Sequence, residues 1–128
     1  MVVKLKRAYE LPTPDDGERY LVERLWPRGI SKTNLGLTAW LKDLAPSTDL
    51  RKWYGHRAEL WPEFVRRYQI ELSAREKQRS LRDLVKKAQD GEITLVFATK
   101  VIELSGAAVL RDVITSLAVS SGLNAGKD

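Results

Sequence analysis

Residues 93–100 read ITLVFATK, and this stretch decides the fold. Its apolar side chains, Ile93, Leu95, Val96 and Phe97, lack the strict polar alternation of a strand with one face in water. A continuous apolar run of this length indicates a strand covered on both faces, as in a parallel sheet flanked by helices. The sequence therefore predicts an α/β fold built around this segment.

Two earlier segments also have strand patterns. VVKLKRAY, from residue 2, alternates apolar and basic side chains, and RYLVERLW, residues 19–26, carries a second apolar run. We predict a small, mostly parallel three-stranded sheet, with strands at about residues 2–8, 19–26 and 93–98 and helices packed on it. Because a short loop joins the first two strands, that pair could instead be antiparallel.

Helical spacing of apolar residues appears in five segments between and after these strands. Their spacing of three and four is typical of short amphipathic helices. Three of them also start at a serine or threonine and end at a glycine or proline. The predicted helices lie in LTAWLKDLAPS (residues 37–47), STDLRKWYG (47–55), ELWPEFVRRYQIEL (59–72), SLRDLVKKAQDG (80–91) and a segment that starts at Ser105 or Gly106.

Length and composition fit one globular domain. The chain has 128 residues, of which 43% are hydrophobic and 30% charged. We expect a single α/β domain over residues 1–118 and a flexible tail over 119–128, where the sequence becomes rich in Gly, Ser and Asn. No apolar run is long enough to span a membrane, and charge interrupts the first ten residues too early for a secretory leader. The expected location is the cytoplasm.

Cysteine and histidine usage excludes several kinds of site. The chain has no cysteine, which excludes disulfides, zinc–thiolate sites and iron–sulfur clusters. It has one histidine and scattered carboxylates, so no metal site is predicted. No P-loop, dinucleotide-binding turn or nucleophile elbow is present. We predict no cofactor and no membrane partner, and the sequence does not determine the oligomeric state.

The carboxyl ends of the strands are where a ligand is expected, because open parallel sheets bind ligands there. The segments after the second and third strands read RLWPRG and ATKVIE. Arginine has a planar fork suited to phosphate or carboxylate, a tryptophan can form a flat apolar wall, and glycine allows a close turn. The predicted anion-binding residues are Arg24, Trp26, Arg28, Gly29, Ser31 and Lys100.

The same residues have a purely structural alternative. Glu23 and Arg24 form a charged pair in a predicted covered strand, and each must find a partner there. Arg24 could pair with Asp43 and hold a helix to the sheet. In the functional interpretation, Glu23 or Asp43 orients the ligand and His56 acts as a general acid or base at neutral pH. His56 could equally be a capping or packing residue.

All of the net positive charge, +5, lies in residues 51–90. Such an excess attracts anions and supports salt-dependent binding to nucleic acid through backbone contacts. Two solvated helix faces would give the same pattern. The candidate nucleic-acid-binding residues are Arg66, Arg67, Arg75, Lys77, Arg79, Arg82, Lys86 and Lys87.

Three motifs, VERLWPRGISK, WLKDLAPSTDLRKWYGH and WPEFVRRYQIEL, closely resemble the domain-of-unknown-function family 488, specifically its YeaO-like branch. The resemblance extends from residue 2 to about residue 118. It implies a small cytosolic bacterial or archaeal α/β protein, from a family whose biochemical role is not established.

Three departures from the family pattern bear on activity. The family usually has aspartate where this chain has Glu23 and where it has Arg57. After the third strand it typically has an acidic residue and a polar segment with histidine or asparagine, where this chain has TKVIELSGAAVL. If that polar cluster is catalytic in the family, its groups are missing here. A degenerate member that keeps only a partner-binding role is therefore a third alternative.

Overall fold

Strand β4, Ile93–Phe97, lies inside a four-stranded sheet, and all five of its residues are buried. Strand β1, Val3–Arg7, pairs with one side of β4, and strand β2, Glu18–Leu21, pairs with the other, both in parallel. The computed structural model describes the backbone of residues 2–125 and side chains through residue 120. The predicted α/β fold with a parallel sheet is confirmed, and the antiparallel alternative for the first two strands is wrong.

The sheet has four strands, not the predicted three, and its order is β1-β4-β2-β3. The additional strand is β3, Ala39–Trp40, in a segment predicted to be helical. Thr38 and Leu41, on either side of β3, donate backbone N–H groups to carbonyls of β2, at 2.7 and 2.8 Å. These hydrogen bonds join β3 to a strand 19 to 20 residues earlier, and they outweigh the local preference for a helix. Of the predicted helix, only the 3-10 helix η2, Lys42–Leu44, is present.

The second strand is shorter than predicted. β2 ends at Leu21, and the Val22 N–H makes the last ladder contact, to the Val96 carbonyl at 3.0 Å. Because β4 itself ends at Phe97, it offers no further partners. Glu23 and Arg24 therefore lie in the loop beyond the strand rather than on its two faces.

Most of the predicted helices are present. The helix predicted from residue 80 starts five residues earlier, and the segments predicted at 47–55, at 59–72 and from Gly106 are confirmed. The helices are α1, Lys32–Leu35; α2, Thr48–Tyr54; α3, Trp61–Leu72; α4, Arg75–Asp90; and α5, Gly106–Ala125; the 3-10 helices besides η2 are η1, Pro14–Asp16; η3, Ala58–Leu60; and η4, Ile102–Leu104.

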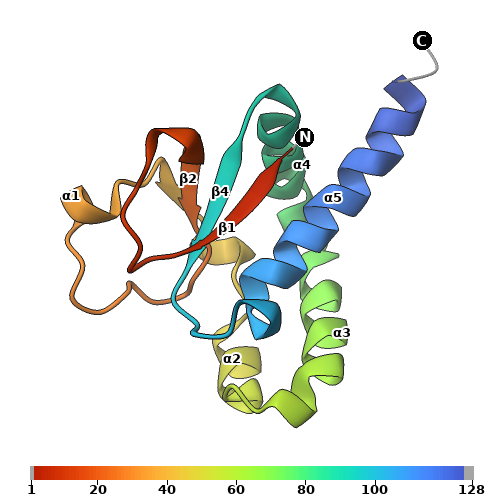
Figure 1. Ribbon diagram of the computed structural model, residues 1–128. Helices are drawn as coiled ribbons and strands as arrows, with labels where there is room; N and C mark the ends of the chain where they lie inside the picture. The colour runs from red at the N-terminus through yellow and green to blue at the C-terminus, as the bar shows by residue number, and fades with distance from the viewer. Residues whose placement is uncertain (1, 126–128) are drawn as a thin grey trace.

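Helices cover both faces of the sheet, as the burial of β4 requires. Helices α3, α4 and α5 gather on one side, and α1 lies on the other (Figure 1). Ile93, Leu95 and Phe97 belong to the larger core cluster with the helical residues, whereas Val96 packs with Leu35 in a smaller cluster. This alternation along one strand explains why its sequence is apolar throughout.

A buried ionic network joins the amino end of β2 to the turn before it. Arg19 donates to Asp16 at 2.7 Å and to the Leu35 carbonyl at 2.9 and 3.2 Å, and both charged residues are buried. Burial raises the pKa of Asp16, but hydrogen bonds from Thr13, Lys6 and Arg19 outweigh it and hold that pKa well below its usual value. The network fixes the end of the sheet opposite to the strands' carboxyl ends.

The carboxyl-terminal boundary at residue 118 stays a prediction. Helix α5 continues to Ala125, so it includes residues 119–125 of the predicted tail, while 126–128 lie outside the described residues. In the part of the chain that the structure describes, no helix has the length and apolar character needed to cross a membrane.

Candidate functional site

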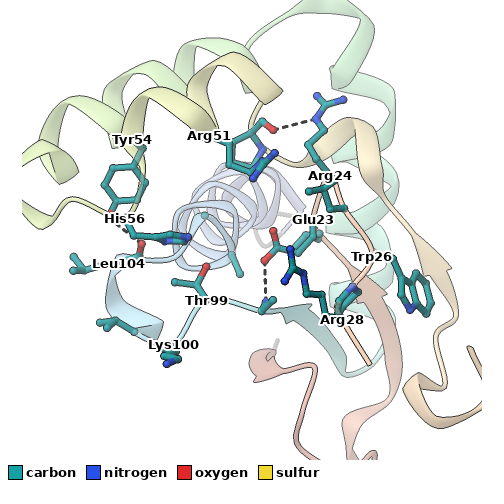
Figure 2. Close-up of a pocket in the computed structure, with 18 of the residues that line it drawn as sticks. Glu23, Arg24, Trp26, Arg28, Arg51, Tyr54, His56, Thr99, Lys100 and Leu104 are labelled. Carbon is teal, nitrogen blue, oxygen red and sulfur yellow. Dashed lines mark hydrogen bonds between the residues drawn. The ribbon is translucent and has the colours of Figure 1, made fainter. Parts of the chain in front are cut away.

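A cavity of about 560 Å³ opens at the carboxyl ends of β1, β2 and β4 (Figure 2). The loops after these three strands supply one side of it, and α2 with the first turn of α5 supplies the other. Its size falls within the range of small-molecule sites. The residues that carry polar or aromatic groups into its lining are Tyr9, Glu23, Arg24, Trp26, Arg28, Arg51, Tyr54, His56, Phe64, Thr99 and Lys100.

Six of the nine residues predicted for an anion site or its chemistry line this cavity together: Glu23, Arg24, Trp26, Arg28, His56 and Lys100. The other three do not. Gly29 is exposed in the bend and has a φ of +77°. A Cβ atom added at this position would have no atom within 4 Å. Ser31 caps α1 by accepting the Asn34 N–H at 3.1 Å, and the Asp43 side chain is 96% exposed outside the cavity.

Arg24 is largely occupied by the protein itself. Its Nε donates to the Pro46 carbonyl at 3.0 Å, and a terminal nitrogen donates to the Ala45 carbonyl at 3.4 Å. The predicted partner, Asp43, lies 3.9 Å away and contributes little, because its carboxylate is in water. Arg24 therefore ties the end of β2 to the loop before α2, which is the structural alternative described above.

Two tryptophans hold the Trp-Pro-Arg-Gly bend in place. The Trp26 indole N–H donates to the Ile30 carbonyl at 2.7 Å, and the Trp40 indole N–H donates to the Glu23 carbonyl at 2.6 Å. The two rings meet edge to face, 5.5 Å apart. The bend is therefore fixed before any ligand arrives, and it keeps Arg28 beside the cavity.

Glu23 lies in the cavity wall, with its carboxylate pointing to the loop after β4 (Figure 2). One oxygen, Oε2, accepts the Ala98 N–H at 2.8 Å. Burial raises the pKa of the Glu23 carboxyl, and the Ala98 N–H, His56 and Arg51 offset part of that shift. The carboxylate is therefore held in an environment that disfavours its charge.

Replacing Glu23 with glutamine is expected to raise the melting temperature of the unliganded protein at neutral pH by about 2–4 °C. The folded-state pKa lies above the unfolded value, so the ionised carboxyl lowers stability, and the amide oxygen can still accept the Ala98 N–H. Thermal melts measure this gain, which should shrink as mild acid protonates Glu23. A drop in melting temperature would contradict the account, and Glu103→Gln, outside the cavity lining, is the charge-matched control.

Arg51 was missed by the sequence analysis. It comes from α2, and its Nε is buried with no hydrogen-bond partner among the described residues. A signal was available: Leu50 and Tyr54 mark the buried face of α2, and Arg51 stands between them, one turn before Tyr54. Arg51 also belongs to the basic segment 51–90, so net charge alone does not distinguish it from the solvent-exposed basic residues of that segment.

Three further polar side chains lie at the cavity mouth. Arg28, His56 and Lys100 are exposed, and none of them forms a hydrogen bond or ion pair with the described part of the chain. His56 has a positive φ of 58° directly after Gly55, a strained conformation for a side chain with a Cβ. Arg28, Lys100 and Arg51 together give the cavity an excess of positive charge over the single carboxylate of Glu23.

The first turn of α5 also lines the cavity. Gly106 and Ala107 line the cavity, and the Ala108 N–H is satisfied by Ser105, through its hydroxyl at 3.2 Å and its carbonyl at 3.1 Å. The amino end of a long helix adds partial positive charge. Within the described residues, no group of three or more metal-ligating side chains gathers here or elsewhere.

The basic residues considered for nucleic acid do not form one free surface. Arg66 and Arg67 both bind Glu63, at 2.7–2.8 Å, and Arg67 also covers the Trp53 ring. Lys77 donates to the Asp43 carbonyl, and Lys87 lies 3.8 Å from Glu18. Among the described residues, the four without such contacts follow one exposed line of α4: Arg75, Arg79, Arg82 and Lys86. The nucleic-acid hypothesis stays a prediction.

Comparison with known proteins supports the resemblance seen in the motifs. Residues 2–125 match the family DUF488-N3i, described as "Inactive DUF488-N3 subclade". The chain is 43% identical to the uncharacterized proteins Mb3100c of Mycobacterium bovis and Rv3073c of Mycobacterium tuberculosis, over 88% of this chain and 92% of theirs. It is 39% identical to the uncharacterized protein YeaO of Escherichia coli, over 91% of this chain and 100% of that protein. No solved structure matches. The chain therefore belongs to the DUF488-N3i family, within the YeaO-like group that its sequence motifs indicated.

Proposed function

We propose that this protein binds a small phosphorylated or nucleotide-like anion in the cavity at the carboxyl ends of its strands. The observation that carries the proposal is Arg51, which lines that cavity and whose buried Nε has no hydrogen-bond partner in the described chain. A buried donor with no acceptor is destabilising, and proteins rarely keep one unless a ligand satisfies it. An anionic oxygen would do so.

The charges around Arg51 support an anion rather than a neutral ligand. Arg28 and Lys100 stand at the mouth with no internal partner among the described residues, and the first turn of α5 faces the same space. Arginine binds phosphate through two parallel N–H groups, while lysine acts as a point charge. Arg51 would hold the anion at the inner wall, and the two exposed cations would attract and retain it.

The apolar part of the wall supports a ligand larger than a bare ion. Tyr54 and Phe64 line the cavity and stack on each other at 4.3 Å, so their edges form a rigid apolar surface. Trp26, in the bend after β2, also lines the cavity. A cavity of about 560 Å³ with aromatic walls accommodates an organic phosphate with a ring or short carbon chain.

Binding is favoured over catalysis by the state of the acidic and basic groups. Glu23 already accepts a backbone N–H, and His56 is exposed at the rim. Asp43, considered for orienting a ligand, lies outside the cavity lining. The family description as an inactive subclade agrees with a binding role.

We expect phosphate monoesters to raise the melting temperature by a few degrees at about ten times their Kd, where binding adds roughly 1.4 kcal/mol. Differential scanning fluorimetry against phenyl phosphate and adenosine monophosphate, at constant ionic strength, measures the shift. Arg28→Ala should weaken binding by roughly threefold to tenfold, because it removes an exposed charge at the mouth. Arg79→Ala, on the exposed face of α4, is the matched control.

Two results would reject the proposal. One is the absence of any shift across phosphate monoesters, inorganic phosphate and carboxylates. The other is equal weakening by Arg28→Ala and Arg79→Ala, which would indicate diffuse attraction by the net positive charge rather than a site.

A further inference from the structure

Glu23 presents a difficulty for any anion in this cavity. Its carboxylate lies in the same lining as Arg51, and only one of its oxygens, Oε2, has a partner, the Ala98 N–H. The other oxygen, Oε1, accepts no hydrogen bond from the described residues. A bare phosphate placed against Arg51 would face this half-buried carboxylate, and like charges repel each other more strongly near the protein than in bulk water.

A ligand that brings its own donor removes the difficulty. A hydroxyl next to the anionic group can donate to the free Glu23 oxygen while the phosphate accepts from Arg51. Carboxylates in α/β folds bind the hydroxyls of a sugar beside a phosphate in this way, because the acceptor fits the hydroxyl and rejects ligands that lack one. The arrangement makes Glu23 a selective group instead of a repulsive one.

We infer that Glu23 selects anions carrying a hydroxyl close to the phosphate, that is, phosphorylated polyols or sugars, over phosphates with a plain carbon chain. This inference rests on the proposed anion site and specifies its ligand class. Ala98 fixes the orientation of the carboxylate, and the Trp40 indole bonds the Glu23 main-chain carbonyl at 2.6 Å, so the acceptor is held in place before binding. A fixed acceptor discriminates better than a mobile one.

One alternative is a protonated Glu23, since burial raises the pKa of this carboxyl. A neutral carboxyl would donate to a phosphate oxygen and give no preference for hydroxyls. Arg51 and His56 favour the ionised form of Glu23. Comparing ligands with and without hydroxyls separates the ionised from the protonated state of Glu23.

The test compares glycerol 1-phosphate with n-propyl phosphate by isothermal titration calorimetry at neutral pH and constant ionic strength. Both are phosphate monoesters with a three-carbon chain, and they differ by two hydroxyls. The unsubstituted protein is expected to bind glycerol 1-phosphate roughly tenfold or more tightly, as a hydrogen bond to a charged group implies. Glu23→Gln should bring the two affinities within about threefold, mainly by improving n-propyl phosphate, because the repulsion is gone. Glu103→Gln should keep the preference.

The outcomes separate this inference from the proposed function. Equal affinities in the unsubstituted protein would overturn the hydroxyl preference and leave the anion site standing. A preference that survives Glu23→Gln would overturn the role of Glu23. If neither monoester binds, the proposed anion site and the hydroxyl preference that rests on it are both rejected. If Glu23→Gln does not fold, the comparison of the two ligands on the unsubstituted protein still decides the hydroxyl preference.

Discussion

Replacing Arg51 with methionine is expected to weaken the binding of phosphate monoesters roughly 30- to 150-fold, corresponding to about 2–3 kcal/mol for a charge-assisted hydrogen-bonded contact. The Arg51 guanidinium makes no hydrogen bond within the described chain, so the substitution breaks none, and the unbranched methionine side chain retains most of the apolar stem. Arg51 offsets part of the cost of the buried Glu23 charge, so the melting temperature without ligand should fall only slightly. Calorimetry and thermal melts measure the two effects separately.

Arg24→Met is the matched comparison, because Arg24 lines the same cavity but donates to the Pro46 and Ala45 carbonyls. It should lower stability, since two carbonyls lose their donor, and it should affect ligand binding less than Arg51→Met. The reverse pattern, with stability lost at Arg51 and binding lost at Arg24, would mean that the roles of the two arginines are assigned the wrong way round.

Gly17→Ala is expected to destabilise the protein by about 3 kcal/mol or more, the combined effect of a strained backbone and overpacking. Gly17 has φ +65 and ψ −144, a region populated almost only by glycine, and an added Cβ would lie 2.0 Å from the Glu92 carbonyl oxygen. That oxygen accepts the Glu18 N–H at 3.2 Å, at the start of β2. The backbone must therefore shift where the buried Asp16–Arg19 network is anchored.

Urea denaturation measures the loss. Gly91→Ala, where an added Cβ meets no atom within 4 Å, is the control and should change stability much less. A Gly17 variant within about 1 kcal/mol of the unsubstituted protein would show that the turn before β2 rearranges freely. Because the cavity lies at the opposite end of the strands, this variant also separates loss of fold from loss of site.

The elements that sequence reasoning found are those whose pattern is local. β4 has five consecutive buried residues, and α3 repeats its buried side chains at every fourth position. Strand β3 could not be found in this way, because Ala39–Trp40 is only two residues long and exists through hydrogen bonds to β2. Trp40 has the spacing of a helical residue but lies on an edge strand, where its indole reaches Glu23.

The location of the candidate site, but not its detail, could be predicted from the sequence. Parallel strands place their carboxyl ends at one edge, so the loops after β2 and β4 had to meet, and Arg28 and Lys100 line one cavity. Whether an arginine has an internal hydrogen-bond partner depends on carbonyls that are distant in sequence. For Arg24 this partner is the Pro46 carbonyl. No spacing rule distinguishes Arg24, bonded to the loop before α2, from Arg51, whose Nε has no partner among the described residues.

The most direct test of the central claim is the ¹H–¹⁵N resonance of the Arg51 Nε–H group during a titration with a phosphate monoester. We predict that this resonance moves and saturates with the calorimetric Kd, while the Nε–H resonance of Arg24, already donating to the Pro46 carbonyl, moves far less. An Arg51 resonance that does not move, or an equal and unsaturated movement of both, would contradict a cavity in which Arg51 is the group that receives the anion.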